Sequence, residues 1–310
     1  MMDAVKTRRQ WTDLPSGLVK RIEGILDGAV VSATSQTEGF SPGSADRVVT
    51  AGGLRAFVKA VHRDHNEGAY DLHLREIEVM RLLPTGVSAP ALLGSVISDD
   101  WAVLVLQDIE GRHPGQAGDG SDVEAVLDAF ATLPRLTGEA RASLPRAADE
   151  FVADQDSWRV IAADAVQVPD WAGVNRDRLR RAGEKVCDVV AGEHLQHFDG
   201  RADNVLVDAD GEAWIIDWPW AASGAHWLDG LFYLLDVRVR GEDVDVEAVL
   251  RRHGLFEGVP AAAIDSVLAA VTGHFFVKAQ LPPPPGMPTL RAFQHREGVA
   301  GMEWLQQRWS

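Results

Sequence analysis

The sequence contains very little cysteine: Cys187 is the only one among its 310 residues. A single thiol excludes an internal disulfide, and chains without disulfides are typical of reducing compartments. The apolar pattern of residues 186–190 predicts that this thiol is a buried structural group. We therefore expect a cytoplasmic protein.

Long apolar runs are also lacking. No run approaches the length of a membrane span, and the basic residues near the N-terminus are not followed by the apolar stretch of a secretory signal. With 46% apolar and 25% charged residues, the composition is that of an ordinary globular protein. We expect no membrane partner, and the length suits one large domain or two coupled lobes.

Basic residues are scarce relative to acidic ones, 30 against 46, which gives a formal net charge of −16. Such a charge disfavours nucleic acid and anionic lipid as partners, and it attracts cations. Two interpretations stay open, a cationic substrate and an acidic proteome background.

The hydrophobic pattern predicts an α+β chain with two lobes. Within a predicted N-terminal lobe of residues 1–107, helices are expected at 14–26 and 66–83, and strands at 30–35, 47–50, 54–61, 92–97 and 101–106. These strands predict a five-stranded antiparallel meander with one helix after the third strand. Residues 108–310 predict a larger, mainly helical lobe, reached through a connection at 108–120 that is rich in Gly, Pro and polar residues.

The most informative segment is His197-Phe-Asp199-Gly-Arg-Ala-Asp-Asn204, followed by Ile215-Ile-Asp217-Trp. Phosphoryl transfer needs positioning, charge neutralisation and a proton acceptor. Asp199 is the candidate acceptor of a substrate hydroxyl proton. Asn204 and Asp217 offer the oxygen ligands that Mg²⁺ prefers.

A tight turn at Asp210-Gly211 predicts a hairpin between these ligands, which would bring position 217 near position 204. His197 is expected to orient its loop and not to do chemistry. The alternative for the polar residues of this segment is an ordinary surface turn, but the aspartate at the end of the next strand favours a site.

The N-terminal half supplies the partners that a kinase needs. Lys59 lies on the predicted third strand, where it would hold nucleotide phosphates, and the following helix offers Glu76 and Glu78 to hold the lysine. No Gly-x-x-x-x-Gly-Lys-Ser/Thr segment occurs, which argues against a P-loop enzyme. The backbone amides of Gly39, Phe40 and Ser41 are expected to meet phosphate oxygens, although this stretch matches a glycine-rich flap poorly.

Together these segments resemble the aminoglycoside phosphotransferase group, which has a protein-kinase-like fold and includes choline kinases. The resemblance covers most of the chain and rests on Lys59, the Leu-Arg-Glu76 helix, Leu104-Val-Leu-Gln-Asp108, the two motifs above and Gly224-x-x-Trp-Leu-Asp229. It implies that Glu76, not Glu78, partners Lys59. It also implies that Gln107, Asp108 and Ile109 meet the adenine through backbone groups, and that a buried Asp229 braces the catalytic loop.

Two residues of the loop depart from this family. Its members usually have glycine after the motif histidine and an apolar residue after the aspartate, where this chain has Phe198 and Gly200. We expect Phe198 to need an apolar environment and Gly200 to loosen the loop. The essential polar groups are all present, so the sequence does not predict an inactive kinase.

The residues that choose the acceptor are harder to predict. Trp218, Trp220 and Trp227 cluster after the metal aspartate, and tryptophan faces bind cations and sugar rings. The alternative for them is core packing. Acidic residues at positions 149–156 could bind amines, but a solvated acidic face explains them as well.

The sequence thus predicts a kinase that depends on ATP and Mg²⁺ and acts on a small-molecule hydroxyl, such as that of an aminoglycoside or another antibiotic. GTP is not excluded as the donor. One alternative is a metabolic kinase for choline, an amino sugar or a hydroxy-amino acid. Another is a nucleotide-binding pseudokinase with a regulatory role, which the intact polar residues disfavour.

Overall fold

The computed structural model describes residues 9–36, 43–98, 100–116, 118, 120–164, 166–284 and 287–310. The chain forms two compact units. The N-terminal unit comprises Met1–Arg112 with the returning segments Asp208–Asp210 and Trp214–Trp220, and the C-terminal unit comprises His113–Val207, Gly211–Ala213 and Ala221–Ser310. The units therefore differ from the predicted lobes, 1–107 and 108–310, in residues 108–112 and in the returning segments.

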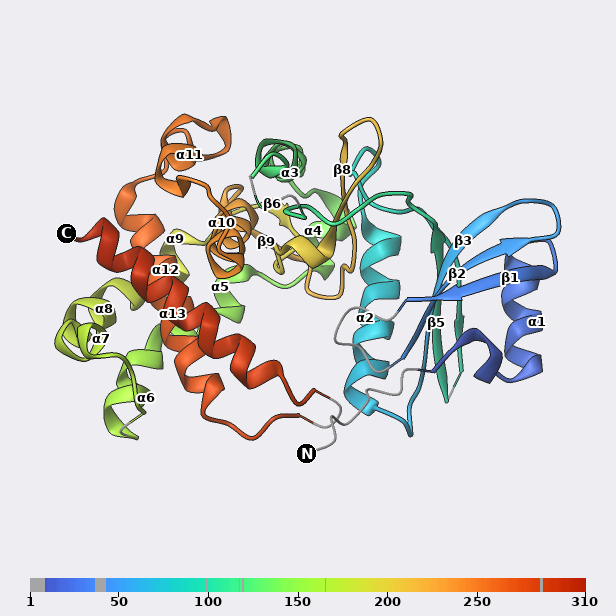
Figure 1. Cartoon of the computed structure of the whole chain (residues 1–310), viewed down its shortest axis with the longest axis horizontal. Coiled ribbons are helices and arrows are strands. Elements are labelled where there is room, and N and C mark those ends of the chain that lie inside the picture. The colour runs from blue at the N-terminus through green and yellow to red at the C-terminus, as the bar shows by residue number, and fades with distance from the viewer. Residues whose placement is uncertain are drawn as a thin grey trace. The chain divides into compact units, whose positions relative to one another are not determined.

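The N-terminal unit contains a five-stranded antiparallel sheet (Figure 1). Its strands are β1 (Val30–Ser35), β2 (Ser44–Thr50), β3 (Arg55–His62), β4 (Leu92–Ile97) and β5 (Trp101–Gln107). Their order is β1-β2-β3-β5-β4, so the predicted meander was wrong: β5 lies between β3 and β4. The reason is burial. Residues 101–106 are almost continuously apolar and fully buried, as a central strand requires, whereas β4 is partly exposed at the edge.

The sheet is covered by a helix on each face (Figure 1). Helix α1 (Ser16–Ile25), which follows the short 3₁₀ helix η1 (Trp11–Asp13), packs against the face that carries Val58 and Ala60. Helix α2 (Glu67–Leu82) packs against the other face, where Val61 lies. Because side chains alternate along a strand, Lys59 of β3 points to the same face as Val61 and therefore toward α2.

The sequence fixes where α2 begins and ends. The side chain of Asn66 accepts a hydrogen bond from the Ala69 N–H at 2.8 Å, which caps the N-terminus. The helix ends at Leu82, and Leu83 precedes a proline that cannot continue it. These boundaries differ by one residue from the predicted helix at 66–83. They place Glu76 near the middle of the helix, on its buried face.

The C-terminal unit is mainly helical. Before the catalytic segment its helices are α3 (Val123–Ala131), α4 (Gly138–Ser143), α5 (Ala147–Glu150), η2 (Asp154–Asp156), α6 (Ser157–Ala163), α7 (Asp170–Val174), α8 (Arg176–Gly183) and α9 (Val186–Val189). Beyond that segment they are α10 (Leu228–Arg240), α11 (Val246–Arg252), η4 (Gly254–Phe256), α12 (Ala261–Ala279) and α13 (Leu290–Arg308). The intervening chain forms β6 (His194–Gln196), η3 (Ala202–Asn204), β7 (Val205–Val207), β8 (Ala213–Ile215) and β9 (Ala222–Gly224).

A small sheet positions the catalytic segment. Strands β6 and β9 pair antiparallel, with Leu195 opposite Ser223. His197 follows β6 directly, and α10 begins four residues after β9 ends. The pairing thus brings the start of the His197–Asn204 loop close to the start of α10, which carries Asp229.

Helix α12 is the core of the C-terminal unit and packs along α13 (Figure 1). It corrects the expectation that no apolar run is long enough to span a membrane. By length and composition this helix of 19 residues could do so, because an 18-residue window of it has a mean hydropathy of 1.3. Of that window, however, 61% is buried inside the protein. The Trp158 indole N–H, for example, donates to the carbonyl of Ala269 at 2.8 Å. A buried core helix passes the same test, so a membrane span has only weak support.

Candidate functional site

Three predicted residues meet within the N-terminal unit. The Lys59 Nζ lies 2.8 Å from each carboxylate oxygen of Glu76 and 2.7 Å from Oδ1 of Asp217, which is 158 positions away in the sequence. Glu78 is exposed on the other side of α2, so Glu76 is the glutamate that binds the lysine. Burial alone would lower the pKa of Lys59, but the charges of Asp217 and Glu76 outweigh burial and raise it.

Asp217 is held in an unusual backbone conformation. Its φ is +66°, in the left-handed region, which costs a non-glycine residue about 1–2 kcal/mol. The flanking chain fixes it, because the Ile215 N–H donates to the Ser88 carbonyl at 2.7 Å and the Trp218 N–H to Glu76 Oε1 at 3.4 Å. The Asp217 side chain is still 48% exposed. Strain of this kind, imposed by the surroundings, is often found at functional sites.

The predicted adenine-binding residues are the last residue of β5, Gln107, and the two that follow it, Asp108 and Ile109. The Gln107 N–H donates to the Ala91 carbonyl at 2.8 Å, which continues the sheet. The carboxylate of Asp108 is buried and binds Arg47 at 3.4 Å and Arg55 at 2.7 Å. Arg47 also donates to the Ile109 carbonyl at 3.1 Å. Asp108 therefore uses its side chain to anchor this segment to β2 and β3, a role that the sequence analysis did not identify.

The sequence also predicts a flap over the nucleotide phosphates. Gly39, Phe40 and Ser41 lie outside the described residues. Their role remains a prediction.

In the C-terminal unit, Asn204 holds Asp199. The Asn204 side-chain nitrogen donates to Oδ2 of Asp199 at 2.8 Å and to the Asp199 carbonyl at 2.9 Å. Burial raises the pKa of the Asp199 carboxyl, and the charges of Arg201 and His197 oppose that increase. The loop therefore presents a partly buried carboxylate in a fixed orientation.

The carboxylate of Asp229 holds the start of this loop. It is fully buried and accepts the backbone N–H groups of His197 at 2.6 Å and of Phe198 at 2.8 Å. Burial raises the pKa of Asp229 to about 6, although the interaction with His197 and these two hydrogen bonds act in the other direction. The geometry fits the bracing role that the family resemblance implied. His197 is likewise fully buried.

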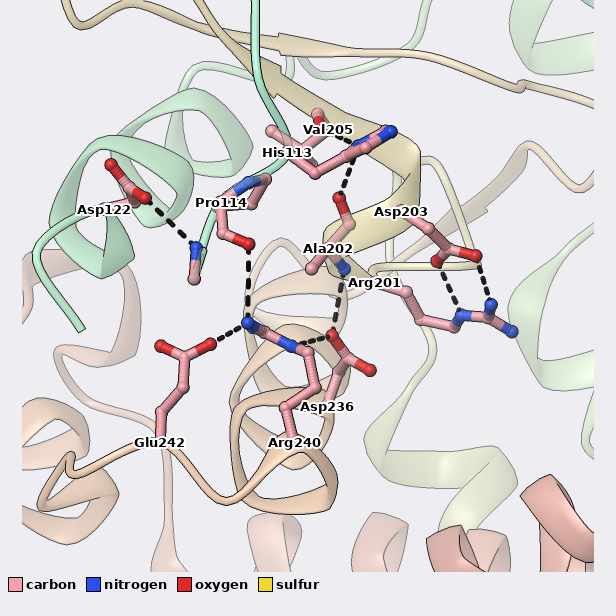
Figure 2. Close-up of polar contacts among 11 residues, drawn as sticks. His113, Pro114, Asp122, Arg201, Ala202, Asp203, Val205, Asp236, Arg240 and Glu242 are labelled. Atoms are coloured by element: carbon pink, nitrogen blue, oxygen red, sulfur yellow. Dashed lines mark hydrogen bonds and ion pairs between the residues drawn. The ribbon is translucent and has the colours of Figure 1, made fainter. Parts of the chain in front are cut away.

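A second aspartate of α10 holds the other end of the loop, as Figure 2 shows. Asp236 accepts the Ala202 N–H at 2.9 Å and the Arg240 Nε–H at 2.8 Å. Asp229 and Asp236 are seven residues apart, which places them on one face of the helix. The two carboxylates therefore bind the loop on either side of Asp199.

The segment before α3 also contacts this end of the loop (Figure 2). His113 Nδ1 lies 2.9 Å from the Val205 carbonyl and 3.2 Å from the Ala202 carbonyl. The Gly115 N–H donates to Asp122 at 3.1 Å, and Arg240 forms an ion pair with Glu242. These residues carry no sequence signal of their own, because their importance depends on where the chain folds back.

Phe198 has a left-handed backbone like Asp217, with φ +66°. Glycine adopts this conformation at the least cost. Its ring packs edge-on against Phe151 at 5.7 Å and against Phe232 at 5.8 Å, with an interplanar angle of 79° in each case. Such pairs contribute about 0.5–1.5 kcal/mol each beyond burial, which offsets a backbone cost of about 1–2 kcal/mol. The apolar environment that the sequence required is this aromatic cluster.

Gly200 lies where the loop passes very close to α10. A Cβ at this position would lie 2.5 Å from the backbone carbonyl oxygen of Asp229, closer than real contacts allow. Its backbone is not in the left-handed region. Glycine is therefore required by close packing here, which is a different role from the predicted loosening of the loop.

Arg201 and Glu297 place α13 beside the loop. The guanidinium of Arg201 lies 4.8 Å from the centre of the Phe293 ring and binds Asp203 at 3.0 Å. Glu297, one turn after Phe293, is 9% exposed. Burial raises the pKa of Glu297 to about 8; Arg201 opposes this change, and the charges of Asp199, Asp236 and Asp203 reinforce it. Neither Arg201 nor Glu297 was identified from the sequence.

The predicted substrate tryptophans differ in exposure. Trp218 is 0% exposed and its ring N–H donates to the Ile215 carbonyl at 2.9 Å, and Trp227 is also buried, in the C-terminal unit. Burial favours the core-packing alternative for both. Trp220 is 39% exposed, and the Arg75 guanidinium lies 5.4 Å from its ring centre.

Comparison with known proteins identifies the fold. No family model and no curated protein matches the sequence. Among solved structures, spectinomycin phosphotransferase APH(9)-Ia in complex with ADP and spectinomycin is 11% identical, with a TM-score of 0.62 over 96% of this chain and 99% of that chain. Aminoglycoside phosphotransferase APH(4)-Ia, as a thermostable mutant with ADP and hygromycin B, is 15% identical, with a TM-score of 0.57 over 94% of this chain and 97% of that chain.

The amicoumacin kinase hAmiN, in complex with AMP-PNP, Ca²⁺ and Ami, is 12% identical, with a TM-score of 0.55 over 96% of this chain and 95% of that chain. The chain has the aminoglycoside phosphotransferase fold. The predicted α+β, protein-kinase-like architecture is thereby confirmed. Within this phosphotransferase fold, the roles of individual side chains remain predictions.

We expect Gly200→Ala to destabilise the protein by about 1–3 kcal/mol, because the added methyl group forces the loop away from Asp229. Chemical denaturation followed by circular dichroism measures this. Gly173→Ala is the matched control, since a Cβ at Gly173 of helix α7 meets nothing within 4 Å. Equal stability of the Gly200→Ala variant and the wild type would contradict the close packing.

We expect Glu297→Gln to change how stability depends on pH. The pKa of Glu297 rises from an ordinary 4.5 to about 8 on folding, so ionisation of this carboxyl disfavours the folded state. Relative to the variant, the wild type should lose stability as the pH rises from about 4.5 to 8, by on the order of 5 kcal/mol, and the difference should then level off. Denaturation between pH 4 and 9 measures it. Glu303→Gln, at an exposed position of α13, should show no such trend.

Proposed function

We propose that this protein transfers the γ-phosphoryl group of ATP to a hydroxyl group of a small molecule. The observation that carries the proposal is the contact of Lys59 with both Glu76 and Asp217. These three residues come from a strand, a helix and a distant segment, and the sequence predicts each of them for phosphoryl transfer. A lysine that merely faced solvent would have no reason to contact an aspartate 158 positions away in the sequence.

The charges of this group suit a nucleotide bound with a cation. Lys59 supplies one positive charge, and Glu76 and Asp217 supply two negative ones, so the cluster favours a further cation. We assign Lys59 to the α- and β-phosphates and the exposed carboxylate of Asp217 to Mg²⁺. Asn204 is the second assigned ligand. Because its nitrogen already binds Asp199, its side-chain oxygen is the atom left to bind the metal. Bound Mg²⁺ would neutralise charge on the transferred phosphoryl group.

Asp199 is assigned to the acceptor. In the proposed reaction the hydroxyl oxygen of the acceptor attacks the γ-phosphorus, the bond to the β–γ bridging oxygen breaks, and ADP leaves. The hydroxyl proton passes to the carboxylate of Asp199. A raised pKa makes this carboxylate a better proton acceptor near neutral pH than an exposed aspartate. Asn204 and the brace from Asp229 keep it oriented.

The comparisons support an adenine nucleotide and a small-molecule acceptor. The similar structures contain ADP with hygromycin B, ADP with spectinomycin, and AMP-PNP with Ca²⁺ and Ami. The net charge of −16 suits a cationic acceptor. A coupled ADP-release assay over aminoglycosides, other antibiotics, amino alcohols and sugars tests the proposal, with GTP run beside ATP. Absence of acceptor-dependent ADP release across the panel would count against it.

Asp199→Asn should abolish phosphoryl transfer and leave nucleotide binding largely intact, because the amide cannot accept the hydroxyl proton. We expect a loss of at least about 100-fold in kcat. Steady-state kinetics and calorimetric titration with ATP separate the two effects. Asp177→Asn, at a strongly exposed position, is the matched control. Wild-type turnover in Asp199→Asn would refute the assigned role.

Asp217→Ala should remove the Mg²⁺-dependent part of nucleotide affinity, because it deletes the exposed carboxylate that we assign to the metal. Calorimetric titration of ATP with and without Mg²⁺ measures this. Asp210→Ala, in the exposed turn of the same segment, serves as the control. An unchanged Mg-ATP affinity in Asp217→Ala would mean that another residue holds the metal.

A further inference from the structure

Phe198, the residue before Asp199, is held by both its backbone and its side chain. Its N–H donates to Asp229, its backbone is left-handed, and its ring contacts two other rings. Glycine could adopt this backbone without a side chain. In this chain the aromatic side chain adds a second attachment, independent of the hydrogen bond.

The two partner rings come from different elements. Phe232 lies on α10, three residues after Asp229, so one face of that helix binds both the backbone and the ring of Phe198. Phe151 directly follows α5 and is buried. The rings of Phe151 and Phe232 also contact each other, with centres 6.4 Å apart. Each ring of the cluster therefore touches the other two.

Both chain neighbours of Asp199 are held in place. Phe198, before it, lies in the ring cluster, and Gly200, after it, packs against the backbone of Asp229. The direction in which the Asp199 side chain leaves the loop is set by the backbone of residues 198–200. If the Phe198 ring left the cluster, its φ would be free to return to the common negative range, and Asp199 would turn with it.

We propose that Phe198 is a positioning residue for Asp199, and that the cluster of Phe151, Phe198 and Phe232 fixes the catalytic loop to α10 and to the end of α5. The inference rests on the proposed function for its catalytic consequence. The attachment of the loop can be measured without it. Through the contact of Phe151 with Phe198, the cluster connects the chain at positions 149–156, which carries acidic residues, to the loop that holds Asp199.

The test uses the full chain with Phe198→Ala, Phe198→Leu and Phe151→Leu. Phe276→Leu is the control, because Phe276 is a fully buried ring of α12 whose ring partners are Trp158 and His295. Amide hydrogen exchange of the 195–204 region, read by mass spectrometry, reports the attachment. The kcat and KM values for nucleotide and for the acceptor found in the panel report its effect on the reaction.

We expect Phe198→Ala to raise exchange in residues 197–204 by about tenfold or more, with α12 unchanged. Its kcat should fall by about 10- to 100-fold, and its nucleotide KM should stay within about twofold, because the nucleotide residues are untouched. Phe198→Leu should recover most of both, and Phe151→Leu should lie between. If Phe198→Ala does not fold, Phe151→Leu still decides the matter against Phe276→Leu.

Unchanged loop exchange in Phe198→Ala, or an equal increase in Phe276→Leu, would overturn the proposal. A fall in kcat together with equal changes in nucleotide KM and global stability would also overturn it, because that pattern indicates general unfolding. Faster loop exchange with a selective loss of kcat supports it. If the wild type turns over no acceptor, the proposed function fails, and the exchange data alone still decide whether the ring cluster holds the loop.

Discussion

The hydrogen bonds from the loop backbone to Asp229 are the interaction on which the catalytic loop depends. A carboxylate removed from water is costly unless its oxygens find donors, and both oxygens of Asp229 accept N–H groups of the loop. The brace and the loop therefore require each other. Without the loop the carboxylate would be buried and unpaired, and without the carboxylate the left-handed turn at Phe198 would lose one of its two restraints, the other being the ring cluster.

The N-terminal unit also buries a carboxylate, and there a charged side chain stabilises it in place of backbone N–H groups. Glu76 is buried, and it is stabilised there by Lys59, whose ammonium is shared with Asp217. Burial raises the pKa of Glu76, and Lys59 opposes that rise. The sharing leaves this cluster with more negative than positive charge, at a point where one carboxylate remains exposed. A divalent cation beside the exposed carboxylate would offset this excess of negative charge.

The sequence was sufficient where a signal is local or carried by spacing. The ends of α2, the contact of Lys59 with Glu76, and the burial of Asp229 follow from a cap, a strand followed by a helix, and a family motif. The strand order was mispredicted because alternation reveals faces, not neighbours, although the fully apolar β5 was the available clue to a central strand. Asp236, Phe151 and Glu297 could not be found, because their roles arise only when distant segments fold together.

The regular spacing of α10 has a consequence for how this chain can change. Asp229, Phe232 and Asp236 contact successive points of the loop from positions i, i+3 and i+7 of one helix. Adding or deleting one residue between them would turn the following contact away by about 100°. The spacing of these three residues along α10 must therefore be kept for all three contacts to form. We therefore expect insertions and deletions to be tolerated in the turns outside α10 and not between these three positions.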